Sequence, residues 1–286
     1  MNRRDFQVTT ASALSIRRGY GTLEFELVAG RTVVTRAEAY NPLKWLVPRR
    51  STVAAWAFAS TFGGGLVAGD RIEMQVGVRP GASAVLATQS STKVYRSASD
   101  ADCRQVLGAT VDEGGLMVVA PDPVTCFRGA RYRQQQIIRL HPAATLVYVD
   151  WLTSGRRARG ECWAFSQYRT RLDLYRDGER YLTDSLLLDP NDGPLDSPFR
   201  MGTFHCFAMM VMCGPLTQEA VASLLAEAED QTIDPVNEVV DSVSSLKDGV
   251  IWRIAGRTTE QVARRLQDRL EFLTPILGES PWYRKW

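Results

Sequence analysis

Apolar and polar residues alternate in short runs along most of this chain, and glycine or proline residues separate the runs. The stretch DRIEMQVGV places Ile72, Met74, Val76 and Val78 on one face. Such period-two alternation is typical of a strand with one buried face. Similar runs are GGLMVVAPDP, QQQIIRL, ATLVYVDWL, RTRLDLYRDGERYLTDSLLL and TFHCFAMMVM. The pattern predicts a mainly β protein.

Helical periodicity occurs only late in the chain, in residues 217–230 and 258–274. Thr217 is expected to cap the first helix and Thr258 the second, where Gln261 completes a capping box. The dipeptides Asp177-Gly178 and Asp248-Gly249 each predict a hairpin turn. Rossmann and P-loop folds are disfavoured, because their crossover helices would have to occur earlier in the chain.

No linker or internal repeat divides the sequence. We therefore expect a single domain over residues 1–286, with a β-rich body at 1–214 and a mixed α and β portion at 215–286 that packs against it.

Composition narrows the classes of partner and compartment. The 34 basic residues nearly balance the 32 acidic ones, so no overall charge attracts the chain to nucleic acid or to a membrane. Five widely spaced cysteines, an odd number, favour a reducing compartment. The start, MNRRDFQV, lacks the apolar stretch of an export signal. The expected location is the cytoplasm.

The most unusual local feature is the glycine-rich stretch TFGGGLVAGDR. It lacks the Gly-Lys-Ser/Thr of a phosphate-binding loop, and a strand rather than a helix follows it. The glycines predict an irregular backbone that brings Asp70 to the start of a strand. A tight turn with a solvated aspartate is the alternative. The glycines concerned are Gly63, Gly64, Gly65 and Gly69.

Three acids, Asp70, Asp150 and Asp184, are flanked by apolar strand sequence. A buried charge is costly unless something pairs with it. These acids could pair with arginine or line a polar passage. In STKVYRS, the side chains of Lys93, Tyr95 and Arg96 could bind an anion, but a strand end with a salt bridge to one of the aspartates fits better.

Catalytic and tight metal sites are poorly supported. The chain has two histidines, no Gly-x-Ser-x-Gly elbow, and no Cys-x-x-Cys or His-x-x-x-His spacing. The cysteine- and methionine-rich run FHCFAMMVMC is apolar on both faces and predicts a buried strand. We expect no catalytic residue and no tightly bound cofactor.

Several motifs together resemble the UreD (UreH) family of urease accessory proteins. In order they are GGGLVAGDR, PGA, TKVYRS, PDPVTCFRGARY, VDWLTSGRRARGE, which ends in Gly160 and Glu161, and LTDSLLL. They extend from Gly63 to about Leu188, and the helical ending also agrees. Ala68 departs from a position where family members often have glycine.

The resemblance implies stacked antiparallel or β-helical sheets in one domain, with two helices near the C-terminus. It implies a non-enzymatic maturation factor that binds UreF, which recruits the GTPase UreG, and that docks on urease apoprotein to help insert nickel. Nickel would be in transit through an internal tunnel. The glycine cluster would turn Asp70 toward that tunnel, with Asp150 and Asp184 as the next acids.

Two alternatives remain open. The protein could be a pure adaptor whose aspartates form only structural salt bridges. It could instead be an unrelated β-sandwich hydrolase or carbohydrate-binding module, since the sequence has seven tryptophans. The latter class needs an open cleft with paired acids or exposed aromatic side chains.

Overall fold

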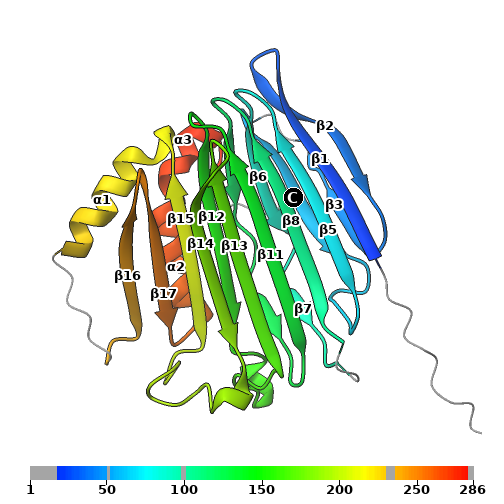
Figure 1. Cartoon of the computed structure of the whole chain (residues 1–286), viewed down its shortest axis with the longest axis vertical. Helices are drawn as coiled ribbons and strands as arrows, with labels where there is room; N and C mark the ends of the chain where they lie inside the picture. The colour runs from blue at the N-terminus through cyan, green and yellow to red at the C-terminus, as the bar shows by residue number, and fades with distance from the viewer. Residues whose placement is uncertain (1–17, 50–51, 98–100, 230–235, 283–286) are drawn as a thin grey trace, which may run out of the picture.

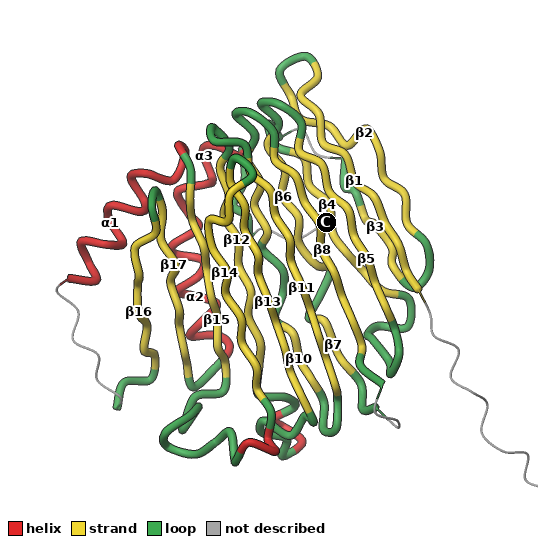
Figure 2. Tube along the Cα trace, viewed as in Figure 1, coloured by secondary structure: helices red, strands yellow, loops and turns green. Residues whose placement is uncertain are grey.

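The fold is built from three layers: two stacked β-sheets and a set of helices (Figure 1). The computed structural model describes residues 18–49, 52–97, 101–229 and 236–282. Strands make up half of the described residues. The three α-helices lie together on one side, and short 3₁₀ turns occur elsewhere (Figure 2). The prediction of a mainly β protein with helices near the C-terminus is confirmed.

Sheet A has seven strands in the order β14-β13-β11-β8-β5-β1-β2. Their bounds are β1 Arg18–Val28, β2 Arg31–Ala39, β5 Arg71–Val78, β8 Cys103–Val111, β11 Arg131–Leu140, β13 Gln167–Arg176 and β14 Glu179–Leu188.

Sheet B follows the order β16-β17-β15-β12-β9-β6-β4-β3, with the short strands β7 and β10 joined beside β12. Their bounds are β3 Leu43–Leu46, β4 Ala55–Thr61, β6 Ser83–Thr88, β7 Thr92–Val94, β9 Leu116–Val119, β10 Val124–Cys126, β12 Thr145–Thr153, β15 Cys206–Cys213, β16 Val239–Leu246 and β17 Gly249–Gly256.

Successive strands of the central part alternate between the two sheets, as in a β-solenoid. In sheet A, β1, β5, β8, β11 and β13 pair in parallel, and in sheet B so do β4, β6, β9 and β12. A strand of the opposite sheet therefore serves as the crossover between parallel neighbours, a task that helices perform in α/β folds. An antiparallel pair of strands forms each edge of both sheets. The centre thus follows the β-helical form.

The main core lies between the sheets, where the inward residues of β5 and its neighbours meet. Ile72, Met74, Val76 and Val78 are all buried there, as the alternation predicts. A second core lies between sheet B and the helices. Sheet B is therefore covered on both faces, which explains why β12 and β15 are almost continuously apolar.

The helices are α1 (Gln218–Glu229), α2 (Thr259–Leu270) and α3 (Thr274–Leu277). The capping box between Thr258 and Gln261 is confirmed. The cap predicted at Thr217 is wrong: its hydroxyl donates to the carbonyl of Gly214 at 2.9 Å, within the 3₁₀ turn Pro215–Thr217 that leads into α1. The predicted end at Asp230 lies outside the described residues. No described helix is long and apolar enough to cross a membrane.

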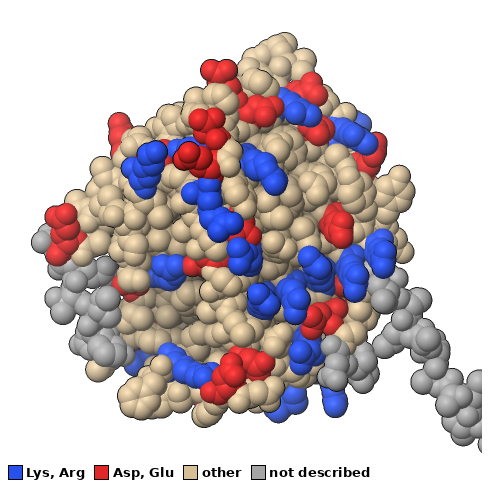
Figure 3. Space-filling model, in the orientation of Figure 1, with Lys and Arg blue, Asp and Glu red and all other residues tan. Residues whose placement is uncertain are grey.

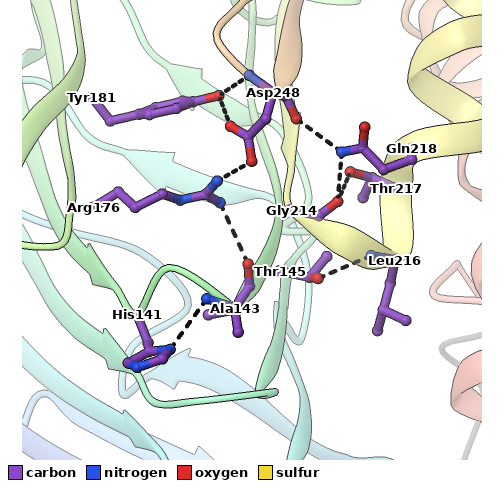
Figure 4. Close-up of polar contacts among 11 residues, drawn as sticks. His141, Ala143, Thr145, Arg176, Tyr181, Gly214, Leu216, Thr217, Gln218 and Asp248 are labelled. Carbon is purple, nitrogen blue, oxygen red and sulfur yellow. Dashed lines mark hydrogen bonds and ion pairs between the residues drawn. The ribbon is translucent and has the colours of Figure 1, made fainter.

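The predicted hairpin at Asp177-Gly178 is confirmed. The second hairpin also forms, but its turn lies one residue earlier than predicted, at Lys247 and Asp248, because Gly249 is already paired with Leu246 in β17. A polar cluster joins the two hairpins (Figure 4). Asp248 accepts a hydrogen bond from Tyr181 Oη at 2.6 Å and forms an ion pair with Arg176. The Gln218 amide donates to the Asp248 carbonyl at 3.1 Å. This cluster ties the β16–β17 turn and the start of α1 to sheet A.

Candidate functional site

The glycine-rich segment lies against β7. Gly63, Gly64 and Gly69 have φ values of 89°, 70° and 84°, which favour glycine. At Gly65 the reason is close approach: a Cβ atom there would lie 2.7 Å from the Lys93 carbonyl oxygen. The backbone of the segment therefore packs closely on the strand that carries Lys93.

Asp70 closes the turn at the end of this segment. Its side chain is buried, and Oδ2 accepts a hydrogen bond from the backbone N–H of Val67 at 3.0 Å. Cys103 Sγ donates to the Val67 carbonyl at 2.9 Å. Burial raises the pKa of this thiol to about 12, and the charge of Asp70 adds to the effect, so the thiol remains protonated. Asp70 thus contributes to the local turn.

Two adjoining cavities lie between the sheets. The glycine-loop cavity, of about 120 Å³, is lined by Gly64, Gly65 and Lys93 among others. The inner cavity, of about 70 Å³, reaches Asp150. Each volume is sufficient for several waters. The two cavities share the lining residues Ala59, Thr88, Thr92 and Gln105. Asp70 and Asp184 line neither.

Asp150 lies on β12 and faces sheet A across the inner cavity. The side-chain nitrogen of Gln134, on β11, is 2.8 Å from Oδ1 and 2.7 Å from Oδ2. Thr170, on β13, donates its hydroxyl to Oδ2 at 2.9 Å. Tyr132 donates to the Gln134 amide oxygen at 3.1 Å, which orients that amide. All of these partners are neutral.

The Asp150 carboxylate makes no ion pair with a cationic side chain in the described part of the chain. Burial raises its pKa above the usual range, and the nearby charge of Asp184 raises it further. The hydrogen bonds from Gln134 and Thr170 act in the opposite direction. An approaching cation would relieve the cost of this buried negative charge.

Asp184 lies on β14, on the far side of β13 from Gln134. It forms an ion pair with Arg253 of β17, so this contact joins sheet A to sheet B. Asp184 is in register with Leu172 of β13, two residues from Thr170, which donates a hydrogen bond to Asp150. The structure therefore brings Asp150 and Asp184 into one region and places Asp70 in a separate turn.

Lys93, Tyr95 and Arg96 extend along β7 and beyond it. The Tyr95 hydroxyl donates to the Gly64 carbonyl at 3.4 Å. Lys93 and Arg96 are exposed. Neither makes an ion pair with a described acid, so the expected salt bridge from this strand end to Asp70, Asp150 or Asp184 is wrong.

Gly160 and Glu161 follow the 3₁₀ turn η1 (Arg157–Arg159). Gly160 ends the turn with a φ of 72°. Glu161 accepts a hydrogen bond from Nε of Arg156 at 2.9 Å, and this bond lowers the pKa of the carboxyl. The guanidinium of Arg156 lies 3.9 Å from the ring centre of Phe127, which also contacts Tyr95. Three sequence motifs therefore meet at Phe127, which itself belongs to PDPVTCFRGARY.

The sequence interpretation missed Gln134, Thr170 and Arg253. A signal for Gln134 was present in β11: its buried positions alternate as Tyr132, Gln134, Gln136, Ile138 and Leu140. Two polar side chains at inward positions of an otherwise apolar face indicate a polar interior. Nothing local in the sequence could show that Arg253 reaches Asp184.

Other kinds of site find little support in the described part of the chain. It contains no group of three or more histidine, cysteine or acidic side chains that could hold a metal ion. No tryptophan of the described residues, which do not include Trp286, is among the large apolar side chains that are exposed. The tryptophans therefore give no support to a carbohydrate-binding module, although the side chains of Tyr40, Phe62 and Phe199 are exposed.

Comparison with known proteins agrees with the motif order. Residues 17–286 match the family described as UreD urease accessory protein. A urease accessory protein UreD of Sorangium cellulosum (strain So ce56) is 46% identical over 271 residues, covering 94% of this chain and 85% of that protein. Urease accessory protein D of Arabidopsis thaliana is 34% identical over 293 residues, covering 92% and 99%. The chain therefore belongs to the UreD family of urease accessory proteins.

Proposed function

We propose that this protein is a cytoplasmic, non-enzymatic scaffold that passes nickel to urease apoprotein in a complex with UreF and UreG. Family membership supports a role in urease maturation. The proposed route is the pair of cavities between the sheets, from the glycine-loop cavity to the inner cavity. Nickel is the cargo on this route and is held only in transit.

One observation carries the proposal: Asp150 is a buried carboxylate beside a cavity, and its hydrogen-bond partners are neutral. Such a group costs stability in the free protein. A divalent cation in the adjacent cavity would supply the missing opposite charge. The arrangement therefore suits a residue that interacts with a passing cation.

The chemistry of the lining also suits release of the cargo. Carboxylate, amide and hydroxyl oxygens bind nickel more weakly than sets of thiolates and imidazoles do. Transport requires binding that permits entry and also exit. Asp184, which is paired with Arg253, would adjust the charge around Asp150. Asp70 would act near the glycine segment that lines the glycine-loop cavity.

A pure adaptor is the second candidate. The contact between Asp184 and Arg253 and the turn closed by Asp70 favour it, because both are ordinary structural roles. In that case UreF, UreG and the apoprotein would still assemble on this chain, and the cavities would contain only water.

The test is co-expression of urease with its accessory proteins and either the wild-type chain or Asp150→Asn. Asparagine preserves the shape and removes the charge. We expect a several-fold lower nickel content per urease active site with unchanged recovery of the accessory complex. Asp241→Asn is the matched control, because Asp241 is a buried aspartate in the other core, where it accepts a hydrogen bond from Trp252 at 2.7 Å. If urease co-expressed with either variant contained equal nickel, the proposed role of Asp150 would be refuted and the adaptor role would remain.

A further inference from the structure

The exposed face of sheet A carries five arginines in one row across the strands. Arg18 of β1 is in register with Arg71 of β5, and Arg71 with Arg104 of β8. Arg104 is in register with Arg133 of β11, and Arg133 with Arg169 of β13. Because residues in register on parallel strands point to the same face, these side chains lie side by side. We call this set the arginine row.

The row is open to solvent and mostly unneutralised. Figure 3 shows basic side chains gathered in a band over the strands of sheet A. Four of the five arginines are exposed and Arg133 is half-buried. Among the described acids, only Asp102 pairs with the row, at 3.2 Å from Arg133, and it also pairs with Arg131 at 3.3 Å.

Such a row opposes folding. Like charges on neighbouring strands are destabilising, and adjacent strands are only about 4.8 Å apart. The rest of the chain offers little compensation, because the residues outside the described ranges include six basic and four acidic ones and so carry no net negative charge. The opposite charge must therefore come from another molecule.

The spacing between the arginines favours a helical partner over an extended one. Four intervals of about 4.8 Å give a row of about 19 Å. Acidic side chains at every third or fourth position of a helix recur at about 4.5–6 Å along its axis, because each residue rises 1.5 Å. On one face of an extended strand they recur at about 6.7 Å, so they would soon fall out of step with arginines about 4.8 Å apart. A helix of about 13 residues would span the row.

We propose that the arginine row is the docking surface for an acidic helix of a partner protein, which lies across the strands of sheet A. Arginine suits this task, because its planar group binds carboxylates with two parallel hydrogen bonds. The row occupies the outer face of strand segments whose inner residues, Ile72 and Gln105, line the glycine-loop cavity. A bound helix would thus lie directly outside that cavity. The proposal does not depend on nickel transport.

The test uses the full chain and two synthetic alanine-rich helical peptides of equal composition. One peptide has glutamates on a single face, at every third or fourth position, and the other has them distributed around the helix. Fluorescence anisotropy should show tighter binding of the one-faced peptide, weakened by salt. Arg71→Gln/Arg104→Gln should weaken this binding about tenfold or more. Arg157→Gln/Arg159→Gln, which removes two exposed arginines from η1, should leave it unchanged.

Three results would overturn the proposal. The two peptides could bind equally, the row variant could bind as wild type does, or a single-stranded DNA oligonucleotide or anionic vesicles could bind the row more tightly than the one-faced peptide. Circular dichroism of each variant establishes that folding is retained.

Discussion

The side-chain nitrogen of Gln134 lies 2.8 and 2.7 Å from the two carboxylate oxygens of Asp150, and this contact joins the two sheets across the interior. A glutamine at this position supplies hydrogen bonds without supplying charge. The carboxylate is therefore held in place while its charge remains uncompensated, a state that depends on both strands being paired in their observed register.

The first prediction is that Asp150→Asn stabilises the free protein at neutral pH. The folded-state pKa of Asp150 is raised above the usual 3.8, so the folded state binds the proton more tightly than the unfolded state does. Stability contributed by the protonated form is fully present below pH 3.8 and is lost as the pH rises through the folded-state pKa. Thermal unfolding at several pH values should show the advantage of the variant grow with pH. An advantage that shrinks as the pH rises would contradict this assignment.

Asp70 is expected to show separable effects of charge and shape. Asp70→Asn retains an oxygen that accepts from the Val67 N–H, so stability should stay close to wild type. Asp70→Ala loses that acceptor and should cost about 1 kcal/mol. If Asp70 also acts on nickel, both variants lower the nickel content of co-expressed urease, by less than Asp150→Asn does, because Asp70 lines neither cavity. Chemical unfolding and metal analysis provide the two readouts; normal nickel content in Asp70→Asn would remove its charge from the mechanism.

The ion pair between Asp184 and Arg253 is predicted to contribute coupling energy. The two side chains are 17% and 37% exposed, so solvent screens their interaction and a coupling of about 1 kcal/mol is expected. A double-mutant cycle with Asp184→Asn, Arg253→Gln and the combined variant measures it by urea unfolding. Strict additivity of the two single effects would show that the contact does not stabilise the fold.

The pair formed by Glu227 of α1 and Arg269 of α2 is predicted to weaken in acid. The hydrogen bond from Arg269 lowers the pKa of Glu227 to about 2 from 4.5. Its contribution to stability is therefore present above pH 4.5 and is lost as the pH falls toward 2. Because Glu227 is 51% exposed, the contribution stays below about 1 kcal/mol. The melting temperatures of wild type and Glu227→Gln should differ near neutral pH and converge at about pH 2. A constant difference across this range would refute the prediction.

Much of the secondary structure follows from the sequence. The alternation in residues 71–78 fixes which side chains of β5 face the core, and the capping box at Thr258 starts α2 where it was predicted. These features are local, because a strand repeats every two residues and a helix cap involves four neighbouring residues. Thr217 shows the limit: a residue suited to capping instead extends a 3₁₀ turn, since the preceding Gly214 and Pro215 shape the entry to α1.

The sequence by itself also determined the family, through the joint order of six motifs, and identified Asp150 as an acid within an apolar strand. Only the tertiary structure decided which strands are neighbours. Asp150 and Gln134 are 16 residues apart, Asp184 and Arg253 are 69 apart, and the five arginines of the row come from five strands. Such contacts depend on pairing and register between distant segments, which the periodicity of any one segment does not specify.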